Sequence, residues 1–521
     1  AALREQLTEH AGLFGIDRVV YHAGPIDPLG HGFSWKRFVL GSSATAVLLG
    51  LAAVFRSKFQ LAPRPLPSGS VSAAFRIAFL AIFVVSLFNS DLGHDSESYA
   101  PYVGPASAVA LGAIPLTDVF SVYGLSYLIL TACLKFLPWS MYSLSLVVTV
   151  LNLAYYLVVA WICIRISKDK TLATVLSAFL ILFLVNAALY NSAYTPSAGG
   201  MRYLPSMILL LTLCYLKDRS TFSYPSALAL CVSSLWSLDA LIFSSVTYSA
   251  YIVAGSLRPR PVDLVAIVRR HLFLCLLVLL PHALLTATYM ACFGEPPRYD
   301  VYWDVIATLS RSSDWAVSAD PAIRTWLIFG FGYAIALAHA LFKCRTAEEL
   351  SARDHRYAVI AATAALGIMQ FSYYAGRSVT PVLLFLAFPL VILFVLFMES
   401  LVDSITTTTR QKRKCAHQWA VLGLIACTLV ACGGVIADKF FRPPFVLRSN
   451  ATVLRYCFSK EAEGLNCLAA QARSVREKLK QPAGFVLPGA SGVTDQDPQA
   501  WQLIPTKMTR EDIDAYLLVK K

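Results

Sequence analysis

The chain has 521 residues, of which 57% are hydrophobic and 14% charged, and its mean hydropathy is +0.60. This composition excludes a soluble globular protein, because so few polar residues could not cover the surface of a water-exposed fold of this length. The formal net charge of +13 does not indicate nucleic-acid binding. The basic residues lie largely in short loops between apolar runs, where they set the orientation of a membrane protein.

Apolar runs of about 17–25 residues recur along most of the chain, and this length matches the hydrocarbon thickness of a bilayer. Because lipid offers the backbone no hydrogen-bond partner, each run is expected to be an α-helix. We assign no structure to residues 1–37. The pattern predicts an all-α integral membrane domain over 38–436, with about twelve transmembrane helices. The predicted spans lie near residues 38–55, 73–90, 141–165, 171–190, 201–216, 224–237, 239–256, 271–292, 323–342, 357–374, 379–400 and 417–436.

The loops between these spans differ in charge. Lys and Arg gather at 56–64, 165–170, 217–219, 258–270, 343–356 and 410–414. If these basic loops face the cytoplasm, as the positive-inside rule predicts, the others face outside. The expected outer loops are 91–140, 191–200, 236–239, 293–322, 375–378 and the tail from 437.

The apolar run from Leu125 to Leu137 is not counted as a span, because a crossing there would invert every later loop. The run is also short for a crossing. We therefore expect residues 106–137 to form interfacial helices that lie on, or dip into, the outer membrane face. The whole segment 91–140 then becomes a large first outer loop.

A dense group of ionisable residues opens this loop: Asp91, His94, Asp95 and Glu97, followed by Tyr99. These side chains could simply be solvated at the membrane edge. Alternatively, one carboxylate is a general base at the interface, where a polar acceptor from water can meet a donor anchored in lipid. Partial burial would raise the pKa of that carboxylate toward a useful range.

The sequence around and after this group carries a set of spaced motifs: Asp95-Ser-Glu97-Ser-Tyr99, Gly112-Ala-Ile-Pro115, Asp118-Val-Phe120 and Tyr123-Gly124. This pattern resembles the first outer loop of the polytopic glycosyltransferases with the C-type fold. That superfamily includes the protein O-mannosyltransferases and the lipid A aminoarabinose transferases. The resemblance is best over 90–165 and points to the superfamily without naming a member.

The resemblance implies a hexosyl- or pentosyltransferase that moves a sugar, with inversion, from a polyprenyl-phosphate donor to a glycan, lipid or protein acceptor. Asp95 stands where the family's catalytic aspartate usually lies and would deprotonate the acceptor hydroxyl. Many members have Glu directly after that Asp, whereas Ser96 follows here, so Asp91 and Glu97 remain alternative bases. Asp95 and Glu97 could also hold a divalent cation, and no other cofactor is implied.

Other residues of the same loop are expected to contact the substrate: His94, Tyr99 and Tyr123. The leaving phosphate needs cationic or hydrogen-bonding partners on the same face. Arg202, with Tyr203 next to it, opens a span, and Arg377 lies between two spans on the predicted outer side. Because arginine is less expected in outer loops, both are candidate phosphate ligands. The alternative for each is an anchor that reaches the lipid headgroups.

Two later outer segments add candidate substrate contacts. Asp239 lies where two short spans meet, and it is either a site residue or the cap of the second helix. The loop 293–322 carries Tyr302 and Trp303 beside carboxylates, a combination that suits sugar binding. The alternative for this loop is an amphipathic interfacial helix with an aromatic belt.

The tail 437–521 is expected to form a small C-terminal extramembrane domain on the outer face. It contains Cys457 and Cys467, which could pair in an oxidising compartment or remain free thiols. The high Ala, Leu and Arg content fits a bacterial inner membrane, where this face and the active site would be periplasmic.

Two other functions compete with the transferase. A polytopic transporter or lipid-linked glycan flippase would carry ionisable or helix-breaking residues near the membrane midplane, often in inverted repeats. In this chain the ionisable residues gather at the predicted outer edge. An O-antigen ligase or polymerase would be expected to place its main catalytic loop late in the chain, not after an early span.

Overall fold

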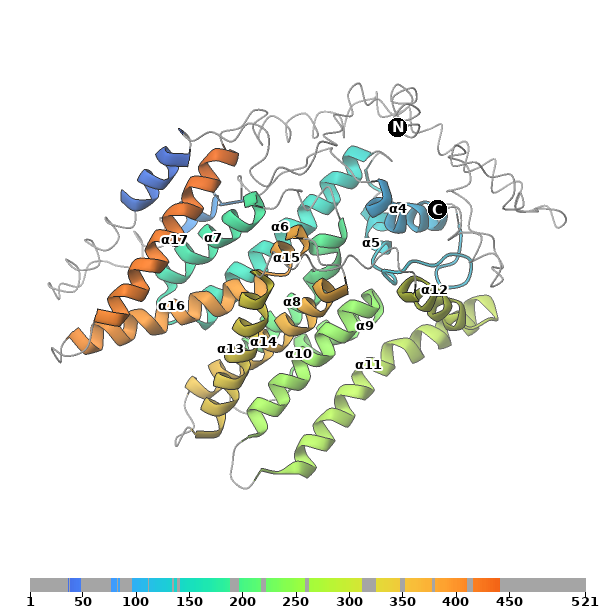
Figure 1. Cartoon of the computed structure of the whole chain (residues 1–521). Helices are drawn as coiled ribbons and strands as arrows, with labels where there is room; N and C mark the ends of the chain where they lie inside the picture. Colours follow the sequence, from blue (N-terminus) through green and yellow to red (C-terminus); the bar gives the residue numbers. More distant parts are fainter. Residues whose placement is uncertain are drawn as a thin grey trace.

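The chain is described here from a computed structural model. Its described residues are 36, 38–47, 76–81, 83–84, 96–110, 112–133, 135–137, 141–187, 196–216, 222–257, 262–311, 325–346, 352–376, 380–409 and 416–440. All regular secondary structure in these ranges is helical (Figure 1), apart from a single bridge between Pro115 and Val119.

The labelled helices are α4 (Ser96–Ala110), α5 (Leu128–Cys133), α6 (Met141–Ile166), α7 (Lys170–Ala187), η1 (Pro196–Ala198), α8 (Gly200–Leu213), α9 (Tyr224–Trp236), α10 (Leu238–Ser256), α11 (Leu264–Phe293), α12 (Tyr299–Arg311), α13 (Thr325–Thr346), α14 (Ala352–Gly376), α15 (Thr380–Phe385), α16 (Phe388–Thr409) and α17 (Ala416–Phe440). The predicted spans from 141 onward fall on α6 to α11, α13, α14, α16 and α17. The prediction of a helical chain is confirmed for the described residues.

Among the described residues, four helices are long and apolar enough to cross a membrane, judged by length and composition: Leu146–Ile166, Leu238–Ser256, Leu264–Phe293 and Leu327–Thr346. The full set of twelve crossings stays a prediction. The predicted span 379–400 is not one continuous helix. It is divided into α15 and α16 at Leu386 and Ala387. Pro389 lies in the first turn of α16 and has no N–H to donate to Phe385, which explains the interruption.

The short helix α8 lies at the core of the bundle. Eleven of its fourteen residues are buried, and it packs against α6, α9 and α10. By contrast, α11 and α13 expose many apolar side chains along their length, as expected for helices that face lipid. The first turn of α8 is therefore enclosed by its neighbours, which matters because Arg202 lies in that turn.

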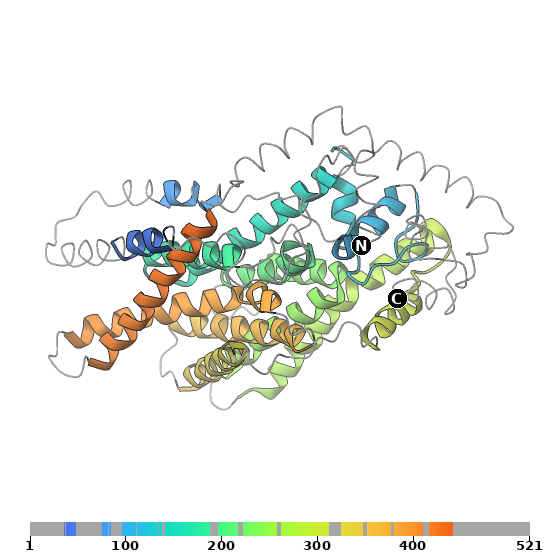
Figure 2. The same ribbon diagram turned by 45° about the horizontal axis from the view of Figure 1, so that its top comes forward.

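The first predicted outer loop lies at one end of the bundle. Figures 1 and 2 show α4 and α5 there, close to α12 and the adjoining end of α11. The loop's helices differ from the expected 106–137: α4 already begins at Ser96, residues 112–127 are largely irregular, and α5 has six residues. A helix of six residues is about 9 Å long and cannot cross a bilayer. Leaving the run from Leu125 to Leu137 out of the span count is thus confirmed.

Candidate functional site

Two predicted outer loops, 91–140 and 293–322, are joined by direct contacts. The backbone N–H of Arg298 donates to the carbonyl of Leu116 at 2.7 Å, and the Tyr289 hydroxyl donates to the carbonyl of Pro115 at 2.6 Å. Leu116, Phe120, Val301 and Tyr302 form an apolar cluster between the loops. The sequence placed both loops on one side of the membrane, and the structure puts them at the same end of the bundle.

A buried ion pair lies at this end. Arg202 is 5% exposed, and its Nη2 and Nε lie 2.7 Å and 2.9 Å from the same oxygen of Asp239, Oδ2. The third guanidinium nitrogen, Nη1, is buried and has no hydrogen-bond partner among the residues that the structure describes. An arginine in this state has one edge satisfied and one edge with unused N–H groups.

Three tyrosines surround the guanidinium group. The Arg202 Cζ atom lies 3.8 Å from the ring centroid of Tyr373, 5.6 Å from that of Tyr123 and 5.7 Å from that of Tyr203. These distances fall within the range of cation–π attraction. Tyr123 belongs to the first outer loop and Tyr373 to the end of α14, so the arginine joins segments that are far apart in the chain.

Local sequence explains why Arg202 is buried. The backbone N–H of Gly200, which opens α8, donates to Asn152 Oδ1 at 2.7 Å. A Cβ atom at Gly200 would lie 2.2 Å from the carbonyl oxygen of Leu151, so α8 can approach α6 this closely only with glycine there. The close approach places the first turn of α8, and Arg202 with it, inside the bundle.

The partner acid is positioned by the start of α10. Ser237 is the N-cap of this helix, and its hydroxyl accepts from the backbone N–H of Ala240 at 3.1 Å. Asp239 is therefore not the N-cap, and the capping alternative raised by the sequence is wrong. Its carboxylate is available to Arg202 and remains 31% exposed.

The first outer loop reaches the arginine through a tight turn. Ser121 Oγ donates to the carbonyl of Pro101 at 2.7 Å, and the Tyr123 ring stacks on Tyr102 with centroids 4.7 Å apart. Gly124 follows with a φ of +61°, and a Cβ there would lie 2.7 Å from the carbonyl oxygen of Trp236. The motif Tyr123-Gly124 thus combines a ring that faces the arginine with a residue that lets the loop dock against α9.

The phenols of the loops at this end are neutral. Burial raises the pKa of Tyr102 and of Tyr123, and burial together with the nearby negative charge of Asp239 raises the pKa of Tyr302. These hydroxyl groups therefore stay protonated at physiological pH. They can donate hydrogen bonds and carry no charge that would repel an anion.

Several buried donors around the first turn of α8 have no hydrogen-bond partner in the described part of the chain. They are Arg202 Nη1, the Tyr102 and Tyr155 hydroxyls and Asn152 Nδ2. The Tyr155 ring lies beside Tyr203, with centroids 6.3 Å apart, and the other Asn152 amide atom already holds Gly200. Unpaired buried polar groups are uncommon and costly, so this region is suited to a ligand rich in oxygen acceptors.

The sequence-predicted residues divide into three groups. Arg202, Tyr203, Tyr123, Asp239 and Tyr302 gather at the ion pair. Trp303 lies next to Tyr302 on α12 but is 53% exposed, so it is at the edge of the group. Asp91, His94, Asp95 and Arg377 lie outside the described residues, and Glu97 and Tyr99 are described only as part of α4.

Two tyrosines of the group, Tyr102 and Tyr373, were assigned no role from the sequence. Tyr373 lies four residues before Arg377, and this proximity was the available signal. Tyr102 carried no such signal, because it precedes the range 106–137 in which helices were expected; in the structure it lies within α4.

The predicted cation site and the two cysteines of the tail fall on side chains that the structure does not describe. The possible divalent cation was placed on Asp95 and Glu97, whose side chains are not described. In the described part of the chain, no three His, Cys, Asp or Glu side chains are grouped so that they could hold a metal ion. Cys457 and Cys467 also lie outside the described residues.

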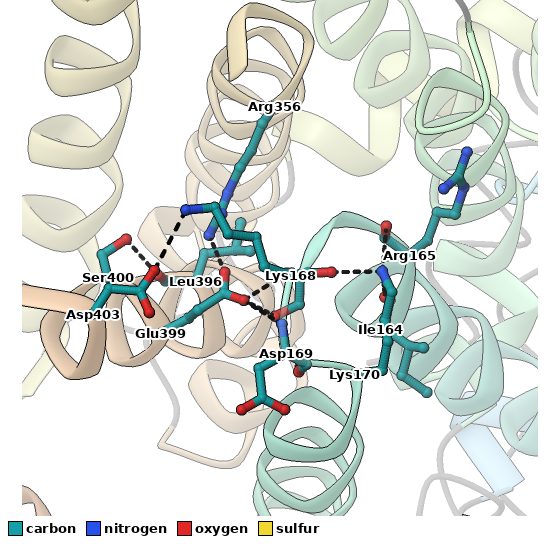
Figure 3. Close-up of polar contacts among 11 residues, drawn as sticks. Ile164, Arg165, Lys168, Asp169, Lys170, Arg356, Leu396, Glu399, Ser400 and Asp403 are labelled. Carbon is teal, nitrogen blue, oxygen red and sulfur yellow. Dashed lines mark hydrogen bonds and ion pairs between the residues drawn. The ribbon is translucent and has the colours of Figure 1, made fainter. Parts of the chain in front are cut away.

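Residues of two basic loops, 165–170 and 343–356, meet around Glu399 at the opposite end of the bundle, and Figure 3 shows these contacts. Glu399 accepts from the Ser167 hydroxyl at 2.8 Å and from the backbone N–H groups of Lys168 and Asp169, and it pairs with Arg356. Arg356 lies near the start of α14 and Tyr373 near its end. This separation corresponds to about 25 Å of helix. The sequence placed 165–170 and 343–356 on one side, and the structure brings them together.

Comparison with known proteins adds no family to this description. No family model, no curated protein and no solved structure matches the chain. The functional assignment therefore depends on the residues around Arg202.

Proposed function

We propose that this chain is a membrane glycosyltransferase that moves a sugar from a polyprenyl-phosphate donor to a cell-envelope acceptor. It crosses a bacterial inner membrane about twelve times, and its active site faces the periplasm. The observation that carries the proposal is the buried Arg202, which keeps unused N–H groups at the end of the bundle where the predicted outer loops meet.

A phosphate group is the ligand that best suits this arrangement. An arginine within an apolar domain is costly unless it is paired, and such residues mark functional sites in membrane proteins. Guanidinium groups bind phosphate through two N–H groups on one edge, and Asp239 takes only the Nε–Nη2 edge. The neutral hydroxyl of Tyr102 can supply a further hydrogen bond.

The chain path supports a shared site for the phosphate and the catalytic acid. Asp95 directly precedes α4, and Tyr102 lies six residues after the start of that helix at Ser96. Six helical residues span about 9 Å. Since Tyr102 stacks on Tyr123 beside Arg202, α4 belongs to this end of the bundle, and we propose that the acidic residues that precede α4 in the sequence share the site. Arg377 immediately follows Gly376, the last residue of α14.

The proposed reaction is a single displacement. Asp95 takes the proton of the acceptor hydroxyl, with Asp91 and Glu97 as the alternative bases. The hydroxyl oxygen then forms a bond to the anomeric carbon while the bond from that carbon to the phosphate oxygen breaks. The electron pair leaves with the polyprenyl phosphate, whose growing charge is stabilised by Arg202 and Arg377.

Substrate contacts in this proposal come from both outer loops. His94, Tyr99 and Tyr123 contribute from the first loop, and Tyr302 and Trp303 contribute from α12. Tyr302 and Trp303 lie with ring centroids 6.1 Å apart, and aromatic faces of this kind pack against the apolar faces of sugars.

One observation favours the alternative of a transporter or lipid-linked glycan flippase. The break between α15 and α16 is the type of discontinuous helix on which transporters build substrate sites. Here, however, the carbonyl of Leu386 in the break accepts from the Tyr333 hydroxyl at 3.0 Å, and Leu383 and Phe385 are buried apolar neighbours. The break is thus packed against other helices and contains no ionisable side chain, and we favour the transferase.

The proposal is tested with the full chain in proteoliposomes that contain labelled polyprenyl-phosphate sugars and a membrane extract as acceptor. We expect a labelled product with the wild type and loss of product in Asp95→Asn and Arg202→Gln. As the matched control, Arg165→Gln changes an exposed arginine 4.8 Å from the ring centroid of Tyr215 and should keep activity. Movement of the intact donor between leaflets without a product would favour the flippase.

A further inference from the structure

Asp239 and Arg202 share an unusual hydrogen-bond geometry. Both contacts from the guanidinium group go to a single carboxylate oxygen, Oδ2, at 2.7 Å from Nη2 and 2.9 Å from Nε. The carboxylate therefore occupies one edge of the guanidinium group and leaves the edge that contains Nη1 unused. That unused nitrogen belongs to a side chain that is only 5% exposed.

The orientation of Arg202 is fixed by more than the ion pair. Tyr373 lies 3.8 Å from the guanidinium carbon, at the distance of a stacked cation–π contact. Because an edge and a face are both held, the plane of the guanidinium group is defined, and so is the direction of the Nη1 edge. A lysine could not be oriented in this way, since an ammonium group has no plane.

Asp239 itself is held on a rigid element. It lies in the first turn of α10, whose N-terminus is capped by Ser237, and α10 packs extensively on α14 and α8. A carboxylate in such a turn is not on a mobile loop that could swing aside to expose the arginine. The packing therefore indicates that Asp239 supports Arg202 permanently. It argues against an acid that moves aside when a ligand binds to the arginine.

We propose that Asp239 is the positioning residue of the phosphate site, holding Arg202 so that its Nη1 edge, together with the Tyr102 hydroxyl, binds the phosphate of an isoprenoid phosphate ester. This inference rests on the proposed function, because it specifies how the donor phosphate is bound. The ion pair is neutral overall, so burying Arg202 without a ligand leaves no uncompensated positive charge in the bundle.

The test uses the purified full chain in detergent with farnesyl phosphate as the probe and farnesol, its uncharged alcohol, as the matched ligand. We expect the wild type to bind farnesyl phosphate and to bind farnesol more weakly. Asp239→Asn should lower the affinity for farnesyl phosphate about tenfold, because the charged hydrogen bond from Arg202 to the phosphate is weakened. Its affinity for farnesol should not change, because the alcohol does not use Arg202.

Two further variants separate positioning from a merely structural role. Asp239→Glu keeps the charge and should retain more of the phosphate affinity than Asp239→Asn. The double variant R202Q/D239N should bind farnesyl phosphate no more weakly than R202Q alone, since Asp239 acts only through Arg202. Losses that multiply in the double variant would overturn the proposal. In the transfer assay, Asp239→Asn should lower kcat/KM for the donor, because Arg202 contacts the phosphate both when the donor binds and as its charge grows.

The experiment distinguishes failure of the positioning role of Asp239 from failure of the proposed function. If the wild type does not distinguish farnesyl phosphate from farnesol, there is no phosphate site and the proposed function itself fails. If the wild type does distinguish them and Asp239→Asn binds equally well, the positioning role is wrong and the function stands. Tighter binding by Asp239→Asn would make the acid a competitor of the ligand, which also contradicts positioning. If Asp239→Asn does not fold, the comparison of Asp239→Glu with wild type decides.

Discussion

The two ends of the bundle each contain a buried pair of an acid and an arginine, and the pairs differ in which member is enclosed. At the end with the basic loops, the carboxylate of Glu399 is 3% exposed and Arg356 is 16% exposed. At the end with the predicted outer loops, Arg202 is 5% exposed and Asp239 is 31% exposed. The first pair thus buries an acid and the second a base.

The pairs also differ in how completely they are satisfied. Glu399 accepts from one hydroxyl, two backbone N–H groups and Arg356, which accounts for the acceptor capacity of a carboxylate. Arg202 keeps an N–H group that no described residue accepts. The comparison teaches that a buried charge marks a candidate binding site when it has unused hydrogen-bonding capacity. A buried charge whose capacity is filled is an anchor between helices.

The largest effect is expected from removing the anchor. Glu399→Ala would leave Arg356 and the backbone N–H groups of Lys168 and Asp169 without their partner. Breaking a buried pair by removing one partner costs about 3–5 kcal/mol. Thermal unfolding of the purified chain should show this loss as a much lower melting temperature. A melting temperature equal to that of the wild type would mean that the pair is not an anchor.

Removing the arginine of the outer pair should affect binding more than stability. Arg202→Gln deletes charged hydrogen bonds, each worth about 1.5–3 kcal/mol, so the affinity for farnesyl phosphate should fall by about 10–100-fold. Asp239 is partly exposed and can be hydrated when its partner is removed. The free energy of unfolding should therefore decrease less in Arg202→Gln than in Glu399→Ala. Calorimetric titration and thermal unfolding of both variants check the contrast. A larger stability loss in Arg202→Gln would reverse the assignment of the two pairs.

A matched pair of glycine substitutions tests the docking of the first outer loop. Gly124→Ala places a Cβ 2.7 Å from the carbonyl oxygen of Trp236 at a φ of +61°, and such strain costs about 1–3 kcal/mol. The affinity for farnesyl phosphate should fall with it, because Tyr123 is displaced. Gly104→Ala in α4 meets no atom within 4 Å and should be neutral or slightly stabilising. Equal unfolding free energies for the two variants would contradict the tight turn.

The aromatic face should contribute less than the charge. Tyr373→Leu removes the ring 3.8 Å from the Arg202 guanidinium carbon and should weaken farnesyl phosphate binding by about 0.5–2 kcal/mol. Tyr373→Phe keeps the ring and should bind nearly as well as the wild type. If both variants lose affinity equally, the hydroxyl and not the ring face supports the arginine.

The smallest effect is expected from an exposed pair near the anchor. Lys168 Nζ lies 3.4 Å from Asp403 Oδ2, and the two side chains are 59% and 51% exposed. Solvent-exposed pairs contribute about 0–1 kcal/mol. Lys168→Ala should therefore leave the melting temperature almost unchanged, although the backbone N–H of the same residue bonds to Glu399. A loss as large as that of Glu399→Ala would show that the side chain is part of the anchor.

Much of the fold could be predicted because lipid imposes helices on apolar runs of a given length. The alternation of basic and non-basic loops also predicted which segments share an end, and this brought Arg202, Asp239 and Tyr302 into one group. The pairing of Arg202 with Asp239 could not be predicted, since it depends on how α8 and α10 are rotated and packed. Hydropathy contains no information on that rotation.

Two errors have identifiable physical causes. The span at 379–400 was predicted as continuous, although Pro389 removes the donor that a continuous helix needs. The start of α4 at Ser96 was missed, and this helix contains Pro101 and Pro105, a residue type that disfavours a helix interior. A helix is thus interrupted near Pro389 but continues through two other prolines, so a proline in the sequence does not by itself tell where a helix ends.

The central claim is that the Arg202 end faces out of the cell and the Glu399 end faces the cytoplasm. Membrane-impermeant maleimide labelling of single cysteines in a cysteine-free background tests it directly. Glu295 is exposed between α11 and α12, and Lys168 is exposed between α6 and α7. When the outer membrane is permeabilised and the inner membrane is intact, we expect Glu295→Cys to be labelled. Lys168→Cys should be labelled only after the inner membrane is permeabilised as well. Labelling of Lys168→Cys alone in intact cells would place the candidate site in the cytoplasm and contradict the account.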